Sequence, residues 1–353
     1  MKKLHEILKE ERVKNKLLVR EVANKLNIDQ ALVSKFESAV RKPTRAQVVQ
    51  LAKIYNIEEK PLVVAWLSEK IMQHLQYEEF ASDALSMVAE ESAEYEVSKK
   101  PIIPSSDIQN LINDLEKYQN ELKEFRHLDS YKIAEALELE YTFESNRIEG
   151  NTLTLKETDL VINEGLTISG KSMREHLEAI NHTDAIAFIK DLTNKKTIIT
   201  ESIILQIHNL VLRGIDVVNA GRYRTVQVMI KGSKHLPPQP FMVAKQMEDY
   251  FLWYKRNKSK LHPVVLAAYM HEKLVTIHPF IDGNGRTSRL VMNLILLQHG
   301  YVIANIKGDV QSRMKYYEVL EKVQINESQD AFVKFICMEE IDAIKKYIHI
   351  LSR

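Results

Sequence analysis

Apolar residues recur every three or four positions along nearly the whole chain, and this spacing restricts the fold more than any other feature of the sequence. A period of 3.6 residues is that of an α-helix with one buried face. Residues 223–235 instead alternate, with Val226, Val228 and Ile230 preceding the turn Lys231-Gly232-Ser233-Lys234. A period of two indicates a strand, and the turn after it a hairpin. The sequence therefore predicts an all-α protein with one small β-hairpin.

Helices are predicted along both halves of the chain. Four short ones lie within residues 1–56, and a helical, increasingly acidic segment covers residues 58–80. A further helix begins at Ser106-Asp107, which can cap it, and another covers residues 131–148 before the stop signal Gly150-Asn151. The remaining helices are predicted over residues 172–192, 200–213, 241–257, 262–276, 285–299, 311–323 and 330–351.

The charges are unevenly distributed, although the net charge of the chain is only +1. Residues 1–53 contain 13 Lys and Arg against six Asp and Glu, whereas residues 54–100 contain four against ten. The rest of the chain is balanced. A length of 353 residues suggests two or three domains. We therefore predict a basic domain at 1–68, an acidic helical connector at 69–105 and a neutral domain at 106–353.

The composition excludes several classes of protein. Cys337 is the single cysteine, so neither an internal disulfide nor a multi-cysteine zinc site can form. No apolar run approaches the roughly 18 residues that a membrane helix needs, and the first twelve residues are too charged for a signal peptide. We therefore expect a cytoplasmic protein that does not contact a membrane.

The basic domain has the helix spacing of a DNA-binding motif. Residues 18–38 read as helix, turn and helix, and the segment from Asp29 to Glu37 followed by Arg41-Lys42-Pro43 resembles the five-helix XRE domains of phage repressors. Asn27 and Ala39 stand where that family often has glycine. The resemblance implies that base edges face Gln30, Ala31, Ser34 and Lys35, and that phosphates face Arg41 and Lys42. The alternative is a helical bundle that binds another protein.

A short run in the neutral domain combines the residue types that polyphosphate chemistry needs. Asp282-Gly283-Asn284-Gly285 is a turn without bulk directly before an apolar helix, and a helix N-terminus favours anions. Arg286 and Arg289 share one face of its first turn. Asp282 is a hard oxygen ligand suited to Mg²⁺ held jointly with phosphates. His278 is the general base available at neutral pH.

The run from His278 to Arg289 matches the motif H-P-F-x-D-G-N-G-R-x-x-R and thereby resembles the Fic family. The resemblance extends over about residues 108–350 and includes Gly221-Arg222-Tyr223-Arg224. It implies a helical Fic core that transfers AMP from ATP to a hydroxyl side chain of a target protein. In that family pattern His278 is the base, Asp282 holds Mg²⁺, Gly283, Asn284 and Gly285 line the anion site, and Arg286 and Arg289 bind the β- and γ-phosphates.

The same resemblance implies further contacts. Tyr316 or Tyr317 would pack beside the adenine, and Val228, Met229 and Ile230 in the hairpin flap would bind the target backbone as an added strand. Phosphoryl transfer, as in Doc-type toxins of this fold, is less favoured because those proteins carry Lys where Gly285 stands. A second alternative is a transcription regulator that uses the Fic body only as a nucleotide sensor. A homodimer is left open, as are the target and the DNA sequence.

The helix before the core carries a second motif. Ser145-Asn146-Arg147-Ile148-Glu149-Gly150 matches the Fic inhibitory pattern, in which Ser or Thr is followed after three residues by Glu and then Gly or Asn. The resemblance implies an inhibitory helix at 131–150, in which Glu149 pairs with Arg289 and takes the place of the γ-phosphate. In some Fic proteins the same glutamate supports removal of AMP, and that role is left open here.

Overall fold

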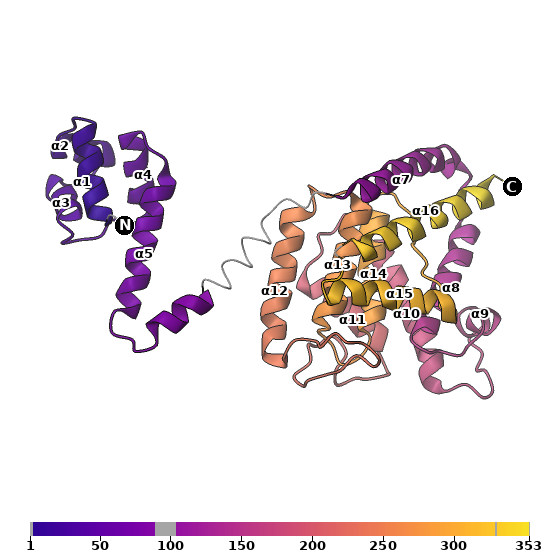
Figure 1. Ribbon diagram of the computed structural model, residues 1–353. Helices are drawn as coiled ribbons and strands as arrows, with labels where there is room; N and C mark the ends of the chain where they lie inside the picture. The colour runs from indigo at the N-terminus through magenta and orange to yellow at the C-terminus, as the bar shows by residue number, and fades with distance from the viewer. Residues whose placement is uncertain (1–2, 89–103, 329, 353) are drawn as a thin grey trace. The chain divides into compact units, whose positions relative to one another are not determined.

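The computed structural model describes residues 3–88, 104–328 and 330–352. The chain divides into two compact units, Met1–Lys100 and Pro101–Arg353. Each unit has its own hydrophobic core. Figure 1 shows both units, with the first in indigo and purple and the second in magenta to yellow.

In the described part of the first unit, five helices surround a small apolar core. They are α1 (Leu4–Lys14), α2 (Val19–Leu26), α3 (Gln30–Glu37), α4 (Arg45–Tyr55) and α5 (Glu59–Leu75). Each helix contributes residues at three- and four-residue spacing to that core, such as Val48, Leu51, Ala52 and Tyr55 in α4. The periodicity of the sequence therefore predicted these elements correctly.

Local polar groups fix the ends of the short helices. The Asp29 carboxylate accepts a hydrogen bond from the Ala31 N–H at 2.6 Å, and Thr44 and Gln47 form a reciprocal cap at the start of α4. Asn27 ends α2 with φ 55°, as expected for a residue that tolerates the left-handed region. Ala39 also has a left-handed backbone, with φ 60°. Both positions where glycine is common in similar domains therefore keep the conformation that glycine favours.

In the described residues of the second unit, helices are the only regular secondary structure, and loops connect them. Its elements are α7 (Ser106–Phe125), the 3₁₀ turn η1 (Arg126–Leu128), α8 (Tyr131–Ile148), α9 (Leu155–Asn163), α10 (Met173–Asn194), α11 (Glu201–Leu212), α12 (Pro240–Asn257), α13 (Pro263–Ile277), α14 (Asn284–Gln298), α15 (Val310–Gln324) and α16 (Ala331–Leu351). The predicted all-α class is confirmed.

Helices α13 and α14 lie at the centre of this unit. They pack more extensively against each other than any other pair of elements, and α10, α11 and α16 cover them (Figure 1). Both helices are buried on nearly all sides, which explains why apolar residues lie on most faces of α13 and of the C-terminal part of α14. The loop 278–283 joins them, so the predicted catalytic run lies between the two most rigidly packed helices.

Two features of this unit differ from the sequence-based expectation. Helix α9 was not predicted, although Thr154 and Glu157 form a capping box at its start. The predicted hairpin at 223–235 is wrong, because no residue of that segment lies in a strand. It runs instead as a loop with a turn at Lys231-Gly232.

The connector predicted at 69–105 is only partly described. Helix α5 continues through Leu75, and residues 81–88 are again helical. Residues 89–103 lie outside the described residues. In the part of the chain that the structure describes, every helix is too short or too polar to cross a membrane.

Candidate active site

The loop between α13 and α14 is held in one conformation by its own side chains. His278 ends α13 in the left-handed region, with φ 50° and ψ 58°, a conformation that costs a residue other than glycine about 1–3 kcal/mol. The Asn284 side chain donates to the Phe280 carbonyl at 2.9 Å and accepts from the Phe280 N–H at 3.0 Å. Asn284 therefore closes the loop, and the strained turn aims His278 toward the start of α14.

The surroundings of His278 favour a neutral imidazole. Its Nδ1 lies 3.2 Å from the Val275 carbonyl, a geometry that places the proton on Nδ1 and leaves the Nε2 lone pair free. The pKa of His278 is lowered to about 4, chiefly by burial. Arg224 also lowers this pKa, whereas Val275 and Glu149 raise it. Nε2 can therefore accept a proton at neutral pH.

The first turn of α14 presents N–H groups and two buried guanidinium groups. Gly283, with φ 75°, precedes the helix, and the first N–H groups of a helix have no partner within it. Arg286 forms an ion pair with Glu178 at 3.1 Å and with Asp282 at 3.4 Å. Arg289 is 1% exposed, and its Nη1 has no hydrogen-bond partner in the described part of the chain. This concentration of donors is suited to an anion.

The Glu149 carboxylate lies at this anion site. Its Oε1 accepts from Arg289 Nη2 at 2.6 Å, and a β-carbon at Gly285 would overlap it. Ser145, one turn earlier in α8, accepts from Arg289 Nε at 3.0 Å through its hydroxyl and from Nη2 at 2.9 Å through its carbonyl. Burial opposes the charge of Arg289, but Glu149 raises the pKa of this group above its ordinary value. The end of α8 is therefore fastened to the anion site.

Asp282 stands at the edge of the same site and is 39% exposed. One carboxylate oxygen contacts Arg174, and the other accepts from the Gly283 N–H at 2.6 Å. Burial opposes ionisation, yet Arg286, Gly283 and Arg174 together hold the pKa of Asp282 below its usual value. An ionised, partly exposed oxygen donor beside an anion site fits Mg²⁺ shared with phosphate oxygens, provided that Arg174, which is more than half exposed, moves aside.

Four residues that support this site were not singled out from the sequence. Glu178 and Arg174 on α10 hold Arg286 and Asp282. His208 on α11 donates from Nε2 to the Asp282 carbonyl at 3.0 Å, and its ring stacks on Phe280. Arg224 donates to the His278 carbonyl at 2.8 Å. The Gly221–Arg224 motif was a signal for Arg224, whereas the others come from distant helices without a local pattern.

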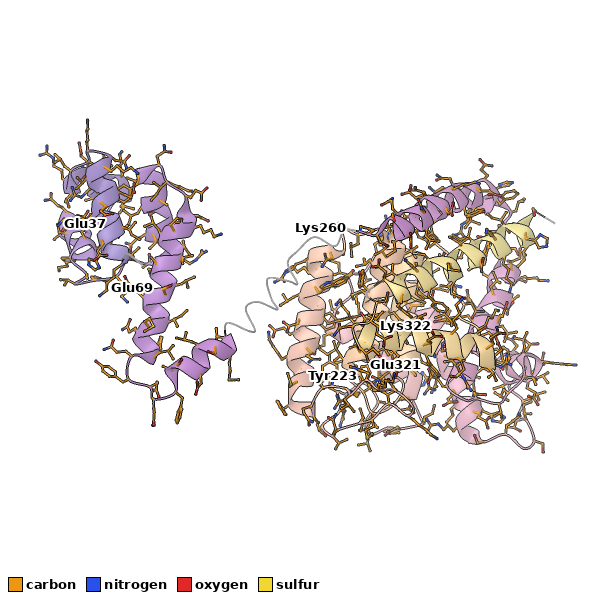
Figure 2. All side chains as sticks on the ribbon, in the orientation of Figure 1. Glu37, Glu69, Tyr223, Lys260, Glu321 and Lys322 are labelled. Atoms are coloured by element: carbon orange, nitrogen blue, oxygen red, sulfur yellow. The ribbon has the colours of Figure 1, made fainter. Side chains whose placement is uncertain are left out.

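The segment 223–239 forms the wall beside His278, and side chains hold it where a hairpin was expected. Arg224 donates to the carbonyls of His278, Val226 and Pro238, and the Gln227 amide donates to the Pro237 carbonyl. Glu321 of α15 (labelled in Figure 2) accepts from the Lys234 N–H at 2.7 Å. Prolines 237, 238 and 240 lack the N–H that a second strand would need. These bonds hold the segment as a loop in place of a strand ladder.

The predicted flap residues differ in exposure. Met229 is 80% exposed, whereas Val228 and Ile230 are half-buried. The two candidate adenine contacts also differ. Tyr316 is 2% exposed and is hydrogen-bonded to His271 in the core, whereas Tyr317 is 42% exposed and donates to the Ile148 carbonyl at 3.1 Å, next to Glu149. Only Tyr317 is accessible at this site.

In the first unit, the predicted DNA-contacting residues lie on one exposed helix and the loop after it. Gln30, Ala31, Ser34 and Lys35 are all exposed on α3, and Arg41 is exposed beyond its end. Lys42 is also exposed, but its ammonium group lies 3.5 Å from the carboxylate of Glu69 on α5 and donates to the Glu69 carbonyl. Glu69 is labelled in Figure 2.

Comparison with protein families identifies a domain in each unit. Residues 198–296 match the model described as the Fic/DOC family, and residues 8–62 match the model described as a helix-turn-helix. The first range includes the loop 278–283 and most of α14. The second begins within α1 and ends within α5.

Several curated relatives are named protein adenylyltransferase Fic. A protein adenylyltransferase Fic of Nematostella vectensis is 39% identical over 209 residues, which are 58% of this chain and 48% of that protein. The protein of the same name from Drosophila persimilis is 40% identical over 204 residues, which are 57% of this chain and 39% of that protein. The chain thus spans less than half the length of these relatives.

Solved structures show the same architecture. Fic-1 from C. elegans is 25% identical with a TM-score of 0.62, and the match covers 95% of this chain and 97% of that chain. A Fic family protein from Desulfovibrio desulfuricans is 26% identical with a TM-score of 0.60, covering 72% and 78%. The chain therefore carries a Fic/DOC family domain behind an N-terminal helix-turn-helix domain.

Proposed function

We propose that this chain transfers AMP from ATP to a hydroxyl side chain of a target protein, that α8 holds it in an inhibited state, and that its first unit binds DNA. One observation carries the proposal. The Glu149 carboxylate lies on Gly285 and Arg289, at the anion site beside a neutral His278. The names of the relatives support the same reaction.

The reaction requires one proton transfer and one displacement at phosphorus. As the hydroxyl oxygen of the target bonds to the α-phosphorus of ATP, its proton passes to Nε2 of His278. The bond between the α-phosphorus and the oxygen bridging to the β-phosphorus breaks, and pyrophosphate leaves. The neutral imidazole supports the first step, and the N–H groups and guanidinium groups at the start of α14 stabilise the charge of the second.

Inhibition follows from competition for Arg289. Productive ATP would place its γ-phosphate on this guanidinium, where Glu149 already lies. Two anions cannot share the site without strong repulsion in a buried environment. ATP therefore binds productively only when the last turn of α8 releases Arg289.

The wall at 223–239 supports docking of a target segment. Residues 226–230 form a loop outside any sheet, and Met229 is exposed beside the half-buried Val228 and Ile230. An extended peptide can pair with such a backbone as an added strand and bring its hydroxyl to His278. Tyr317 supports adenine binding, because its ring is accessible beside Glu149.

Mg²⁺ would be held by Asp282 together with phosphate oxygens of ATP, and would supply neutralisation of their negative charge. Arg174 contacts the Asp282 carboxylate, and this contact would have to open for Asp282 to hold the metal.

DNA binding is proposed for the first unit because its exposed α3 is the second helix of a helix-turn-helix. The +7 charge of residues 1–53 supports salt-dependent affinity. Such a protein would act at a DNA site as well as on a protein target. A palindromic DNA site would be bound by a homodimer.

Labelled ATP tests the reaction. With the Glu149→Gly variant, ATP labelled at the α-phosphate should label protein, whereas ATP labelled at the γ-phosphate should not. The Glu149→Gly, His278→Ala double variant should label with neither. Label from the γ-phosphate would show phosphoryl transfer instead. Tight ATP binding without any covalent label would support the nucleotide-sensor alternative.

A further inference from the structure

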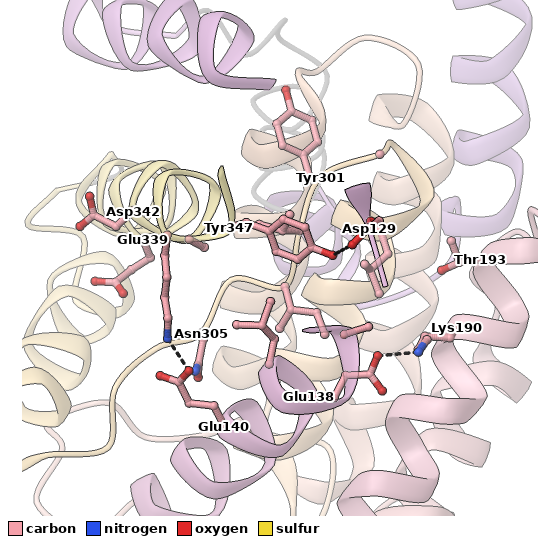
Figure 3. Close-up of a pocket in the computed structure, with 18 of the residues that line it drawn as sticks. Asp129, Glu138, Glu140, Lys190, Thr193, Tyr301, Asn305, Glu339, Asp342 and Tyr347 are labelled. Carbon is pink, nitrogen blue, oxygen red and sulfur yellow. Dashed lines mark hydrogen bonds and ion pairs between the residues drawn. The ribbon is translucent and has the colours of Figure 1, made fainter. Parts of the chain in front are cut away.

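A cavity of about 570 Å³ lies under the N-terminal half of α8 (Figure 3). Its walls come from that helix, the end of α10, α16 and the segment 297–307. None of the residues from His278 to Arg289 lines it. Sites for small molecules usually measure about 300–1,000 Å³, so this cavity has the size of a metabolite site separate from the ATP site.

The cavity leaves one half of α8 incompletely packed. Leu137 and Ile133 are only partly buried, whereas Tyr141 and Ile148 in the C-terminal half are fully buried. Side chains beside a void lose the contacts that a filled interior would give them. A ligand that filled the cavity would supply those contacts to Ala134 and Leu137, which line it.

The basic side chains around the cavity already have acidic partners. Lys190 pairs with Glu138 (Figure 3). Lys346 and Lys307 both pair with Glu140, and Arg126 pairs with Asp129. The hydroxyl of Tyr347 also donates to Asp129. An anionic ligand would have to displace one of these carboxylates, so the wall does not favour an anion.

Two carboxylates on α16 have no such partner. Glu339 and Asp342 lie three residues apart on one face of α16 and both line the cavity (Figure 3). No hydrogen bond or ion pair connects either side chain to another residue within the described ranges. Burial and the neighbouring Asp342 raise the pKa of Glu339, whereas Lys315 and Lys307 lower it. A bound cation would relieve the repulsion between them.

The cation is organic rather than a bare metal ion. In the described part of the chain, no three His, Cys, Asp or Glu side chains converge as a metal-binding group. The cavity also has an apolar wall, formed by Leu137, Ala134, Tyr301, Val302 and Ile303. We propose that this cavity binds a small organic amine, whose ammonium group contacts Glu339 and Asp342 and whose apolar body packs beneath α8.

Two connections link this cavity to the inhibitory contact. The first is α8 itself, a continuous helix over Tyr131–Ile148 in which Leu137 and Glu149 are about 18 Å apart along the axis. The second is the segment at the cavity rim, where Lys307 precedes Gly308, and the Gly308 N–H donates to the Glu144 carboxylate at 2.7 Å. An amine that packs α8 from below therefore holds Glu149 on Arg289 and strengthens inhibition. This regulatory part rests on the proposed function, whereas the binding site does not.

Calorimetry with tryptamine as the probe tests the site in the full chain. Tryptamine should bind saturably, and the Glu339→Gln, Asp342→Asn double variant should bind it at least about fivefold more weakly, as expected for loss of charged partners. Indole-3-propionate, which carries a carboxylate, should not bind. The matched control is Glu248→Gln with Asp249→Asn on exposed α12, which should bind tryptamine as the wild type does.

A second variant tests the site without relying on the fold of the Glu339→Gln, Asp342→Asn variant. Ala343→Trp fills the cavity with an indole ring without removing a charge and should abolish tryptamine binding. The proposed site is contradicted if the wild type shows no saturable binding up to the solubility limit, or if the double variant and the matched control bind equally well.

Hydrogen exchange tests the coupling independently of catalysis. Tryptamine should slow exchange of the backbone amides at 146–150 in the wild type and leave them unchanged in the Glu339→Gln, Asp342→Asn variant. Unchanged or faster exchange despite measured binding would overturn the coupling and leave the site standing. If the Glu149→Gly variant transfers no AMP while tryptamine still binds, the proposed function fails and the site does not.

Discussion

His278 combines a strained backbone with a depressed basicity, and both follow from its position at the end of α13. The left-handed conformation turns the chain at once into the loop 278–283, so the imidazole lies against the protein and loses water. Burial then favours the neutral form. In the proposed reaction, a base that stays neutral needs no activation at physiological pH and only has to receive the proton of a well-placed hydroxyl.

The low pKa of His278 predicts an unusual pH profile for AMP transfer. An imidazole with the ordinary pKa of about 6.5 would lose about tenfold in the rate by pH 5.5. Because burial lowers the pKa of His278 to about 4, kcat/KM of the Glu149→Gly variant should stay within about twofold between pH 7.5 and 5.5. Removing Glu149, whose charge raises this pKa, keeps it low. A tenfold fall over that range, in protein that remains folded, would contradict the assignment.

Arg224 contacts both the proposed base and the segment 223–239, so the geometry of its guanidinium group matters. Its guanidinium donates to three carbonyl groups, those of His278, Val226 and Pro238. A lysine keeps the charge but cannot make these bonds together. In the Glu149→Gly background, Arg224→Lys should lower kcat/KM for a protein target by about tenfold or more. The neighbouring Arg222→Lys is exposed and serves as the control. Equal activity of the two variants would show that the wall does not depend on Arg224.

The C-terminal half of α8 makes hydrogen bonds on two sides. Ser145 and Glu149 hold Arg289 on one side, and Glu144 holds the Gly308 N–H on the other. The helix therefore cannot release Arg289 without also changing its contact with the segment 304–309. The proposed inhibition therefore depends on this packing as well as on the Glu149 carboxylate.

Gly308→Ala tests that packing. A β-carbon at Gly308 would lie 2.8 Å from Cβ of Arg147 and 2.9 Å from the Glu144 carbonyl oxygen, so α8 must shift. Such overpacking should lower the free energy of unfolding by about 1–3 kcal/mol and raise AMP transfer severalfold. In the Glu149→Gly background it should give no further increase, because both changes release the same contact. An unchanged rate in folded Gly308→Ala protein would contradict this role.

The sequence predicted most elements but not every feature of the site. Periodicity was sufficient for the helices because their buried faces repeat in register with the helical turn. It failed at 223–235, where alternating valines resemble a strand but the side chain of Arg224 takes the carbonyl groups that a ladder would use. Helix α9 is short, and only its capping box marks it.

The supporting residues of the site could not be found from local patterns. Glu178 and Arg174 on α10 and His208 on α11 are separated from the loop 278–283 by at least 70 residues, and single His and Glu residues on helices are common. Only packing brings them to Asp282 and Arg286. The inhibitory motif was visible because it is contiguous, but its contact with Gly285 required the fold.

Along the chain, the basic residues 1–53 are followed by the acidic residues 54–100 and then by a second unit whose charges are balanced. A net charge of +1 therefore says little about DNA, since binding depends on the local field of residues 1–53. The structure further separates two neighbouring basic residues there. Arg41 is exposed, whereas Lys42 contacts Glu69.

This difference predicts unequal effects on DNA binding. Arg41→Ala should weaken affinity for DNA about threefold or more and reduce the slope of log affinity against log salt by about one. Lys42→Ala should have a smaller effect, because Glu69 already neutralises its charge. Electrophoretic retardation over a salt series measures both. Equal losses, or binding that does not depend on salt, would contradict DNA binding by this unit.

Autoinhibited AMP transfer is tested most directly by the intact mass of the chain after incubation with ATP and Mg²⁺. We predict that the Glu149→Gly variant gains the mass of one or more AMP groups, that the wild type gains little, and that Glu149→Gly combined with His278→Ala gains none. Equal AMP incorporation by the wild type and Glu149→Gly would contradict inhibition through the contact between Glu149 and Arg289. No AMP on the variant or on any co-incubated cellular protein would contradict the proposed reaction.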